Sequence, residues 1–416
     1  MKNERYGKRV LAQNLSVSNN TRLTGMNNND LIIGGSGCGK TGGYVIPNIQ
    51  NINGSLVVSD TKGQLYRRFH SELRKKGYKV ACIDFCNPEK SVGYNPLAAI
   101  RRNPDGSVRE QDILTVARIL CPDELDRNEK IWSQSAANYI VFLIAYCLDT
   151  EPAEKQNLIT VTNIYRRLSK PKEMLEILDW LYEHPQSFAA KKYDEVNAIR
   201  CADKMFASIM GFVNVGLEMF NYREAEYIFG REMSFDINSL GRKKTVLFIN
   251  NSDTNRTMDK LIILFYNQAL DLLTTDADAT KDGLLKVPVR IIMDDFAASS
   301  TIPDFDKMIS VIRSRDISVS LIIQSLSQLQ SLYDSAVSST IINNCDHLIY
   351  MGSQDIDTAN FISARTCMTP ESVLRMRRDR VCVITNGEKA RWVEKIQPYS
   401  TTVYFDPVEV SGECFM

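Results

Sequence analysis

The chain has 416 residues, of which 44% are hydrophobic and 24% charged, a composition typical of a globular protein with a sizeable core. Lysine plus arginine equals aspartate plus glutamate at 50 each, so no overall basic field points to nucleic acid, and any polyanion site must be local. The longest apolar run, Tyr139 to Leu148, is about half of the ~20 residues that a membrane-spanning helix needs, and the polar start lacks the apolar core of a signal peptide. We therefore expect a chain that faces the cytoplasm and has no transmembrane segment.

The first hundred residues alternate short β-rich runs with helical segments. Strands are predicted at Leu31–Ile33, Ser55–Asp60 and Lys79–Asp84, with helices between them at Thr41–Gln50 and Gln64–Lys76. This alternation is typical of an α/β fold in which helices cover a mainly parallel, wound sheet.

The first strand leads into a glycine-rich loop that matches G-x-x-x-x-G-K-[ST] at every fixed position. In such a loop, backbone N–H groups turn toward a polyphosphate at the N-terminus of the following helix. We expect Lys40 to contact the β- and γ-phosphates of ATP and Thr41 to complete the coordination of Mg²⁺. The predicted nucleotide-binding residues are Gly34, Gly35, Ser36, Gly37, Cys38, Gly39, Lys40 and Thr41.

From about Asn103 to Phe235 the β-rich runs stop and the sequence becomes helical. Helical segments are predicted at Asp112–Leu120, Ile131–Leu148, Pro171–His184 and Tyr193–Phe220. In this region Trp132, Tyr139, Phe142 and Tyr146 have near-helical spacing, which favours a core over a stacking surface for bases. The sequence therefore predicts a nucleotide-binding domain in two parts, residues 1–103 and 236–416, with an inserted all-α domain at residues 104–235.

Strand-like runs return in the last part of the chain. They are Thr245–Asn250, Val289–Asp294, Ser318–Gln324, His347–Met351 and Arg380–Thr385, which makes eight strands in one wound sheet plausible. The segment Thr274–Gly283, rich in Asp, Thr and Ala, is interpreted as an exposed loop.

Polar residues that suit nucleotide chemistry follow two of these later strands. Because Mg²⁺ prefers hard oxygen ligands, Asp294 at a strand end is predicted to hold the ion, and Asp295 to orient or deprotonate the attacking water. Gln324 ends the strand expected beside it and is a candidate sensor of the γ-phosphate. In the segment before that strand, Arg313 or Arg315 is a candidate finger toward a neighbouring subunit, although a solvated helix end explains the spacing equally well.

Several separate motifs in the same order resemble the cytoplasmic ATPase part of the conjugative coupling proteins of type IV secretion systems, especially those of Gram-positive mobile elements. Besides the loop and the acidic pair they include Ser59–Leu65, Tyr94–Leu97, Ile302–Phe305, Ile312–Arg315, Ile323–Ser325 and Tyr350–Ser353. The resemblance implies a RecA-like P-loop motor that uses ATP and Mg²⁺ and assembles as a hexamer around a DNA channel. It places Arg313, with Arg315 as the fallback, where an arginine that acts across the subunit interface is expected. It also implies sequence-independent DNA binding, relaxase or relaxosome proteins and secretion-channel components as partners, and a position at the cytoplasmic face of the cell membrane with the membrane anchor outside this chain.

Two positions depart from the family pattern. The second acidic residue is usually glutamate, and Asp295 is one methylene shorter, which retracts its carboxylate by ~1.5 Å and predicts weak turnover. In the strand-end motif, Thr61 replaces the usual proline while Asp60 and Lys62 are kept, which loosens the turn.

Two alternative functions stay open. Asp295 favours a nucleotide-gated cargo receptor or scaffold that binds ATP with little hydrolysis. A DNA translocase of the FtsK or HerA kind, outside conjugation, is the other, and the sequences around Asn95-Pro96 and Ile302-Pro303 argue against it. Basic clusters dense enough for DNA occur at Arg101–Arg102, Arg166–Lys172, Lys191–Lys192, Arg242–Lys244 and Arg375–Arg380, and most of them are expected to be solvated surface.

Overall fold

The computed structural model describes residues 5–122, 130–201, 203–231, 233–252, 254, 256–296 and 301–396. The chain divides into two compact units. The first consists of residues 1–82, 237–253 and 269–416, and the second of residues 83–236 and 254–268.

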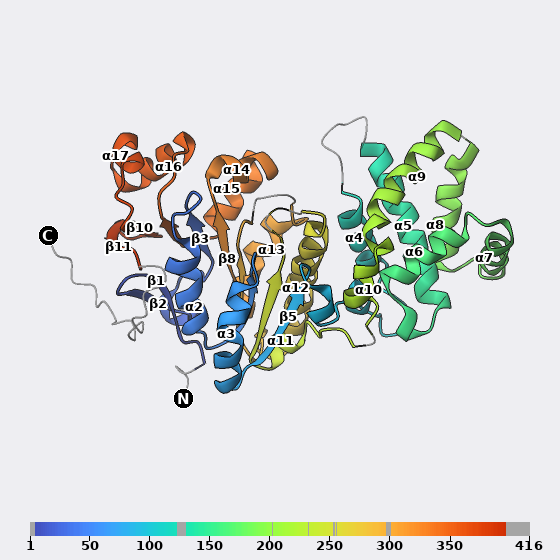
Figure 1. Cartoon of the computed structure of the whole chain (residues 1–416), viewed down its shortest axis with the longest axis horizontal. Helices are drawn as coiled ribbons and strands as arrows, with labels where there is room; N and C mark the ends of the chain where they lie inside the picture. The colour runs from blue at the N-terminus through green and yellow to red at the C-terminus, as the bar shows by residue number, and fades with distance from the viewer. Residues whose placement is uncertain are drawn as a thin grey trace. The chain divides into compact units, whose positions relative to one another are not determined.

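A nine-stranded sheet organises the first unit, in the order β11-β10-β9-β3-β8-β7-β4-β6-β5 (Figure 1). The strands from β9 to β6 pair in parallel, whereas β10 and β11 extend one edge in antiparallel pairing. The strands are β3 (Asp30–Ile33), β4 (Ser55–Ser59), β5 (Lys79–Asp84), β6 (Thr245–Asn250), β7 (Val289–Met293), β8 (Ile317–Ile323), β9 (His347–Tyr350), β10 (Arg380–Thr385) and β11 (Arg391–Glu394).

Helices cover the sheet on both faces, so its central strands are buried on both sides and are mainly hydrophobic. Every residue of β3, β4, β6, β7 and β8 is buried. The helical elements of this unit are α1 (Thr21–Thr24), η1 (Thr41–Val45), α2 (Ile46–Gln50), α3 (Gln64–Lys75), α11 (Ser239–Arg242), α13 (Phe305–Val311), η7 (Ile312–Arg315), α14 (Leu326–Leu332), α15 (Ser335–Asn343), α16 (Ile356–Thr366) and α17 (Pro370–Leu374), and α12 (Asp259–Asp278) belongs in part to each unit.

A small antiparallel hairpin precedes the sheet. Its strands are β1 (Lys8–Ala12) and β2 (Leu15–Ser18), joined at Asn14, which has a positive φ of 54°. The amide of Asn48 on α2 binds the backbone of Val10 twice, accepting from its N–H at 2.9 Å and donating to its carbonyl at 2.8 Å. The hairpin is thereby fixed to the helix that follows the glycine-rich loop.

The second unit is built from helices around α5 (Lys130–Thr150), which contacts α4, α6, α8 and α9. Tyr139, Phe142 and Tyr146 are buried, as predicted, whereas Trp132 is only partly buried. Within the described residues, the stretch Ile131–Thr150 is long and apolar enough to cross a membrane, but 72% of it is buried inside the protein, as in a core helix. The other elements are η2 (Pro88–Lys90), η3 (Pro96–Ala99), α4 (Glu110–Leu120), η4 (Ala153–Lys155), α6 (Leu158–Arg167), α7 (Pro171–Glu183), α8 (Phe188–Asn197), η5 (Ala198–Cys201), α9 (Asp203–Leu217), η6 (Glu218–Asn221) and α10 (Arg223–Phe229).

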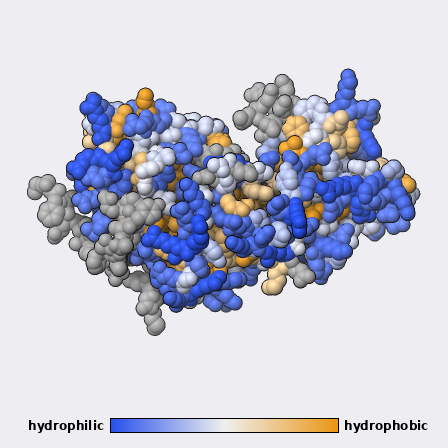
Figure 2. Space-filling view, viewed as in Figure 1, coloured by the Kyte–Doolittle hydropathy of each residue, from blue (hydrophilic) through white to orange (hydrophobic). Residues whose placement is uncertain are grey.

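All eight predicted strands are present, and β11 is a ninth that the sequence did not indicate. The prediction of a loop at Thr274–Gly283 is wrong for its first half, because α12 continues to Asp278. The predicted helical segment Tyr193–Phe220 is divided among several shorter helices. Figure 2 shows mainly hydrophilic side chains on the visible face, with hydrophobic residues in small separate patches.

Candidate nucleotide site

The glycine-rich loop leaves the carboxyl end of β3 and leads into η1, as the motif predicts. Gly34 N–H donates to the carbonyl of Ile323 on β8 at 3.1 Å, and Gly35 N–H donates to that of Gly352 at 2.8 Å. Gly37 and Gly39 have φ of 73° and 82°, where an L side chain would be strained. The backbone thus takes the turning course that places N–H groups around a polyphosphate.

Lys40 lies at the C-terminal end of the loop, directly before η1. Its ammonium donates to the carbonyl of Gly34 at 2.5 Å and to that of Gly35 at 3.2 Å. Thr41 begins η1, a π-helical turn that continues directly into α2. The helix N-terminus and a nearby ammonium make this edge of the sheet favourable for a polyphosphate.

The acidic pair follows β7, two strands away from the loop in the sheet order. Asp294 N–H donates to Ser59 Oγ at the end of β4 over 3.3 Å. Asp295 has a positive φ of 52°, and its N–H donates to Asp294 Oδ1 at 3.1 Å. Because β3, β8, β7 and β4 are parallel, their carboxyl ends bring the loop and both acids to one edge.

Burial, with the neighbouring Asp295 carboxylate, raises the pKa of Asp294 to about 6, and Lys40 opposes that shift. A carboxylate held in this way gains most from a nearby cation, because the cation compensates its lost hydration. The donors at this edge are the Thr41 hydroxyl and the Asp294 carboxylate, both hard oxygens. The residues present therefore fit a Mg²⁺ ion carried by a nucleotide's phosphates.

Gln324 follows β8, which pairs in parallel with β7 as the sequence predicted. Its side-chain amide donates to Asp295 Oδ1 at 3.3 Å. Its backbone N–H donates to Gln328 Oε1 on α14 at 3.2 Å. Gln324 thus connects the acidic pair to the next helix.

The structure does not bring Arg313 to this edge. Arg313 lies on η7, before the amino end of β8, and its guanidinium donates to the carbonyl of Gly25. Arg315 binds Asp278 through two hydrogen bonds of 2.8 and 3.0 Å. The loop follows the carboxyl end of β3, which is parallel to β8. Arg313 and Lys40 of one chain therefore lie at opposite ends of these two neighbouring strands.

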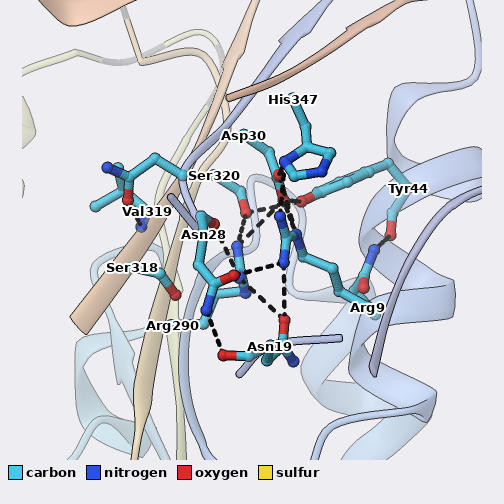
Figure 3. A network of polar contacts seen from close by, with 12 residues as sticks. Arg9, Asn19, Asn28, Asp30, Tyr44, Arg290, Ser318, Val319, Ser320 and His347 are labelled. Atoms are coloured by element: carbon cyan, nitrogen blue, oxygen red, sulfur yellow. Dashed lines mark hydrogen bonds and ion pairs between the residues drawn. The ribbon is translucent and has the colours of Figure 1, made fainter. Parts of the chain in front are cut away.

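A buried polar network lies beneath the loop and was not anticipated from the sequence (Figure 3). Asp30 at the start of β3 is fully buried and accepts from Arg9 Nε at 2.9 and 3.0 Å and from Arg290 Nη1 at 3.2 Å. Tyr44 of η1 donates to Asp30 Oδ2 at 2.5 Å and contacts Ser320 Oγ at 2.8 Å. Although burial acts in the opposite direction, the two guanidiniums hold the pKa of Asp30 below its ordinary value.

His347 of β9 completes this network, with Nδ1 2.8 Å from Arg9 Nη2. Burial, followed by the charge of Arg9, lowers the pKa of His347 to about 4. The ring is therefore neutral at pH 7, and Nδ1 accepts from the guanidinium. The network joins the N-terminal hairpin, the four sheet strands β3, β7, β8 and β9, and the helix of the loop.

Asp60 stabilises the turn that leads into α3. The Asp60 carboxylate accepts from the N–H groups of Leu65 at 3.1 Å and Tyr66 at 2.8 Å, so it caps the start of α3. Gly63 closes the turn with a φ of 61°. The turn keeps this geometry with Thr61 in place of the usual proline.

Many of the basic clusters noted in the sequence are paired with acids. These ion pairs neutralise much of the positive charge that DNA would need. They are Arg101 with Asp112, Arg167 with Glu173, Lys192 with Glu195, Arg242 with Asp276, Arg375 with Glu371 and Arg377 with Asp379.

Comparisons with known proteins agree on one family. The family model for type IV secretory system conjugative DNA transfer matches residues 2–367. Protein VirD4 of Agrobacterium fabrum (strain C58 / ATCC 33970) is 22% identical over 342 residues, which cover 80% of this chain and 48% of that protein. Protein VirD4 of Rhizobium rhizogenes is 21% identical over 338 residues, with the same coverage. The chain spans about half the length of these curated relatives.

Solved structures of the plasmid coupling protein TrwB share the fold. TrwB with the non-hydrolysable GTP analogue GDPNP matches with a TM-score of 0.66 and 13% identity, covering 91% of this chain and 88% of that one. TrwB with ADP and Mg²⁺ matches with a TM-score of 0.60 and 13% identity, covering 89% of this chain and 86% of that one. The expected RecA-like α/β fold is confirmed.

Proposed function

Because this chain belongs to the type IV secretory system conjugative DNA transfer family, we propose that it is a nucleotide-driven coupling protein. In this proposal it docks DNA, with a bound relaxase, at a secretion channel and helps to move the DNA into that channel. The observation that carries the proposal is the meeting of Lys40, the pair Asp294–Asp295 and Gln324 at one edge of the sheet. Lys40 suits the phosphates, Asp294 the cation and Asp295 the attacking water.

Each residue at this edge has a distinct role in the proposal. Mg·ATP, when bound, supplies the phosphoryl group whose transfer to water drives movement. The loop N–H groups and Lys40 bind the phosphates, while Thr41 and Asp294 hold the cation. Asp295 orients the attacking water, and Gln324 reports the state of the site to α14. The TrwB structures with ATP and GTP analogues and with ADP and Mg²⁺ support nucleotide binding in this fold.

Asp295 is the residue that favours the alternative function, a nucleotide-gated receptor or scaffold with little hydrolysis. Its carboxylate is one methylene shorter than the usual glutamate, and the amide of Gln324 holds it at 3.3 Å. A carboxylate withdrawn from the water it should orient slows hydrolysis without weakening phosphate binding. Slow turnover with tight nucleotide binding would suit a gate that presents cargo to the pore.

A shared active site between subunits explains the position of Arg313. Arg313 is exposed and lies at the sheet edge opposite its own loop, so it can act on phosphates only in a neighbouring subunit. Arg315 is already bound to Asp278, which favours Arg313 for this role. We propose that the subunits form a hexameric ring, as the family resemblance implies. Arg313 of one subunit then completes the nucleotide site of its neighbour.

The helical unit offers a surface for a single nucleic acid strand. A cavity of about 790 Å³ there is lined in part by Arg102, Trp180 and His184, and by Arg109, which is paired with Asp112 at 3.7 Å. The rings of Trp180 and His184 stack with centroids 4.4 Å apart, and His184 is exposed. Arginines for phosphates beside an aromatic pair for bases are the means by which proteins bind single strands without sequence preference.

The proposed location is the cytoplasmic face of the cell membrane. There the chain would meet relaxosome proteins on one side and the secretion channel on the other.

The test of the proposed function is DNA binding at two salt concentrations, with and without a non-hydrolysable ATP analogue. We expect tighter binding with the analogue and weaker binding at high salt, because the contacts are to phosphates. Trp180→Ala should weaken single-strand binding, whereas Tyr182→Ala, an exposed aromatic on the same helix, is the matched control. Salt-independent binding, or an assembled ring that binds no DNA, would favour the protein-cargo receptor.

A further inference from the structure

A lysine far along the chain reaches the phosphate-binding loop. Lys395 follows β11 at the edge of the sheet, and its ammonium donates to the carbonyl of Cys38 at 3.0 Å and to the carbonyl of Met351 at 3.1 Å. Cys38 lies inside the loop, and Met351 directly follows β9, the neighbour of β3. Lys395 therefore links the C-terminal hairpin to the loop from behind.

The direction of the Cys38 carbonyl decides where the next N–H points. In a trans peptide the carbonyl oxygen of one residue and the N–H of the next lie on opposite sides of the chain. A donor that binds the Cys38 carbonyl thus directs the Gly39 N–H away from Lys395. Cys38 lies between two glycines with positive φ, Gly37 at 73° and Gly39 at 82°. The backbone on both sides of Cys38 therefore has little steric preference of its own.

The ammonium of Lys395 is in an unfavourable environment for a charge. Only 7% of the residue is exposed, and its partners are two carbonyl oxygens rather than a carboxylate. Burial lowers the pKa of Lys395. A buried ammonium opposes folding unless its hydrogen bonds are well made, and an apolar side chain of the same length would fill the space without that cost.

The hairpin that carries Lys395 is firmly attached. β11 pairs with β10 over four residues, and Lys395 N–H donates to the carbonyl of Asp379 at 2.7 Å. Ile396 is 2% exposed. Gln13 of the N-terminal hairpin donates its N–H to the carbonyl of Glu394 at 3.3 Å. The N-terminal hairpin thus contacts the hairpin that carries Lys395.

We propose that Lys395 is a positioning residue of the nucleotide site: by holding the Cys38 carbonyl it aims the Gly39 N–H at the phosphates of a nucleoside di- or triphosphate. This inference rests on the proposed nucleotide binding of the loop. Lys395 does not touch the nucleotide and acts through the backbone of the loop.

The test compares Lys395→Met and Lys395→Gln with Lys395→Arg and Lys389→Met in the full chain. Methionine removes the donor at nearly the same length, glutamine is too short to reach the loop, and arginine keeps donors for both carbonyls. Lys389 is an exposed lysine in the same hairpin, so Lys389→Met controls for the change of charge. Two quantities are measured: the Kd of a fluorescent ADP with Mg²⁺, and the unfolding temperature without nucleotide.

We expect Lys395→Met and Lys395→Gln to raise the Kd about tenfold while the nucleotide-free protein stays folded, as the loss of a hydrogen bond from a charged group predicts. Lys395→Arg should recover part of the affinity, and Lys389→Met should bind like the parent. A folded Lys395→Met protein with the parent's Kd, or unfolding of both donor-free variants, would overturn the proposal. A parent that binds no nucleotide would instead refute the proposed function.

Discussion

The side-chain amide of Gln324 donates to Asp295 Oδ1 at 3.3 Å, which joins the ends of two neighbouring parallel strands, β8 and β7. Asp295 also donates its N–H to Asp294 Oδ1, so three polar residues form one chain of contacts. Through its backbone N–H, Gln324 is further bound to Gln328 on α14. A movement of Asp295 upon hydrolysis would therefore reach α14 directly.

Asp295→Glu should raise phosphate release by about tenfold, because the added methylene brings the carboxylate ~1.5 Å closer to the attacking water. Nucleotide affinity should change little, since Asp295 does not contact the phosphates in the proposed site. Asp295→Asn is the control and should lower turnover. An active parent that Asp295→Glu does not exceed would show that the shorter acid is fully competent.

Lys40→Ala should remove most Mg·ATP affinity or turnover and leave the fold intact. The ammonium donates only to loop carbonyls in this structure, so its removal deletes a phosphate ligand on a preformed loop. Equilibrium binding and phosphate release measure the effect, and Lys389→Ala, at an exposed site, is the control. Unchanged binding and hydrolysis would rule out the assignment of the loop.

The pKa of Asp294, raised to about 6 by burial and by Asp295, predicts a pH dependence. The folded protein binds this proton more tightly than the unfolded chain, so the contribution of Asp294 to stability falls as pH rises from about 4 to 6. Asp294→Asn should therefore raise the free energy of unfolding at pH 7, by up to about 3 kcal/mol, in the absence of Mg²⁺. Denaturant unfolding at pH 4.5 and pH 7 measures this difference.

Binding of Mg²⁺ with nucleotide should show the opposite trend, because the ion competes with the proton on Asp294. Affinity should fall below pH 6 in the parent protein. A stability difference between parent and Asp294→Asn that is equal at the two pH values would contradict the shifted pKa.

Tyr44→Phe should weaken both stability and nucleotide binding. The Tyr44 hydroxyl ties the first turn after the loop to Asp30 and Ser320, and its loss costs about 1–2 kcal/mol. Tyr78→Phe is the matched control, because its hydroxyl donates to the carbonyl of Ile52 at 2.8 Å, outside the loop and its helix. The control should lose stability without losing nucleotide affinity. Equal nucleotide affinities for Tyr44→Phe and the parent would show that the buried network does not contribute to nucleotide binding.

Arg313→Ala should abolish turnover, and mixing it with inactive Lys40→Ala should restore part of it. In a ring of shared sites, some interfaces then combine an intact loop with an intact Arg313. Activity of the parent should also rise steeply with protein concentration. Absence of rescue over a wide range of mixing ratios, with subunits shown to exchange, would eliminate the action of Arg313 across the interface.

The strands and the nucleotide edge could be predicted because they depend on local sequence. Apolar runs such as Leu31–Ile33 and Ile291–Met293 are followed by glycine or aspartate, and the residue after each run lies at the carboxyl end of a strand in a parallel sheet. That is why Asp294 and Gln324 were found on adjacent strands.

The supporting contacts could not be predicted, because they join residues far apart in the sequence. Arg9 meets His347, and Lys395 meets Cys38, and spacing does not say which strands become neighbours. The end of α12 was missed for a similar reason. Asp276 and Asp278 read as loop residues, but they bind Arg242 and Arg315, and Ala277 between them is fully buried.

The most direct test of the account is phosphate release by the purified chain at saturating Mg·ATP, with and without single-stranded DNA, and with Lys40→Ala as the blank. A DNA-transfer motor predicts slow release that DNA stimulates and that disappears in Lys40→Ala. Tight nucleotide binding with release that DNA leaves at the blank level would contradict the motor and establish a nucleotide-gated scaffold in its place.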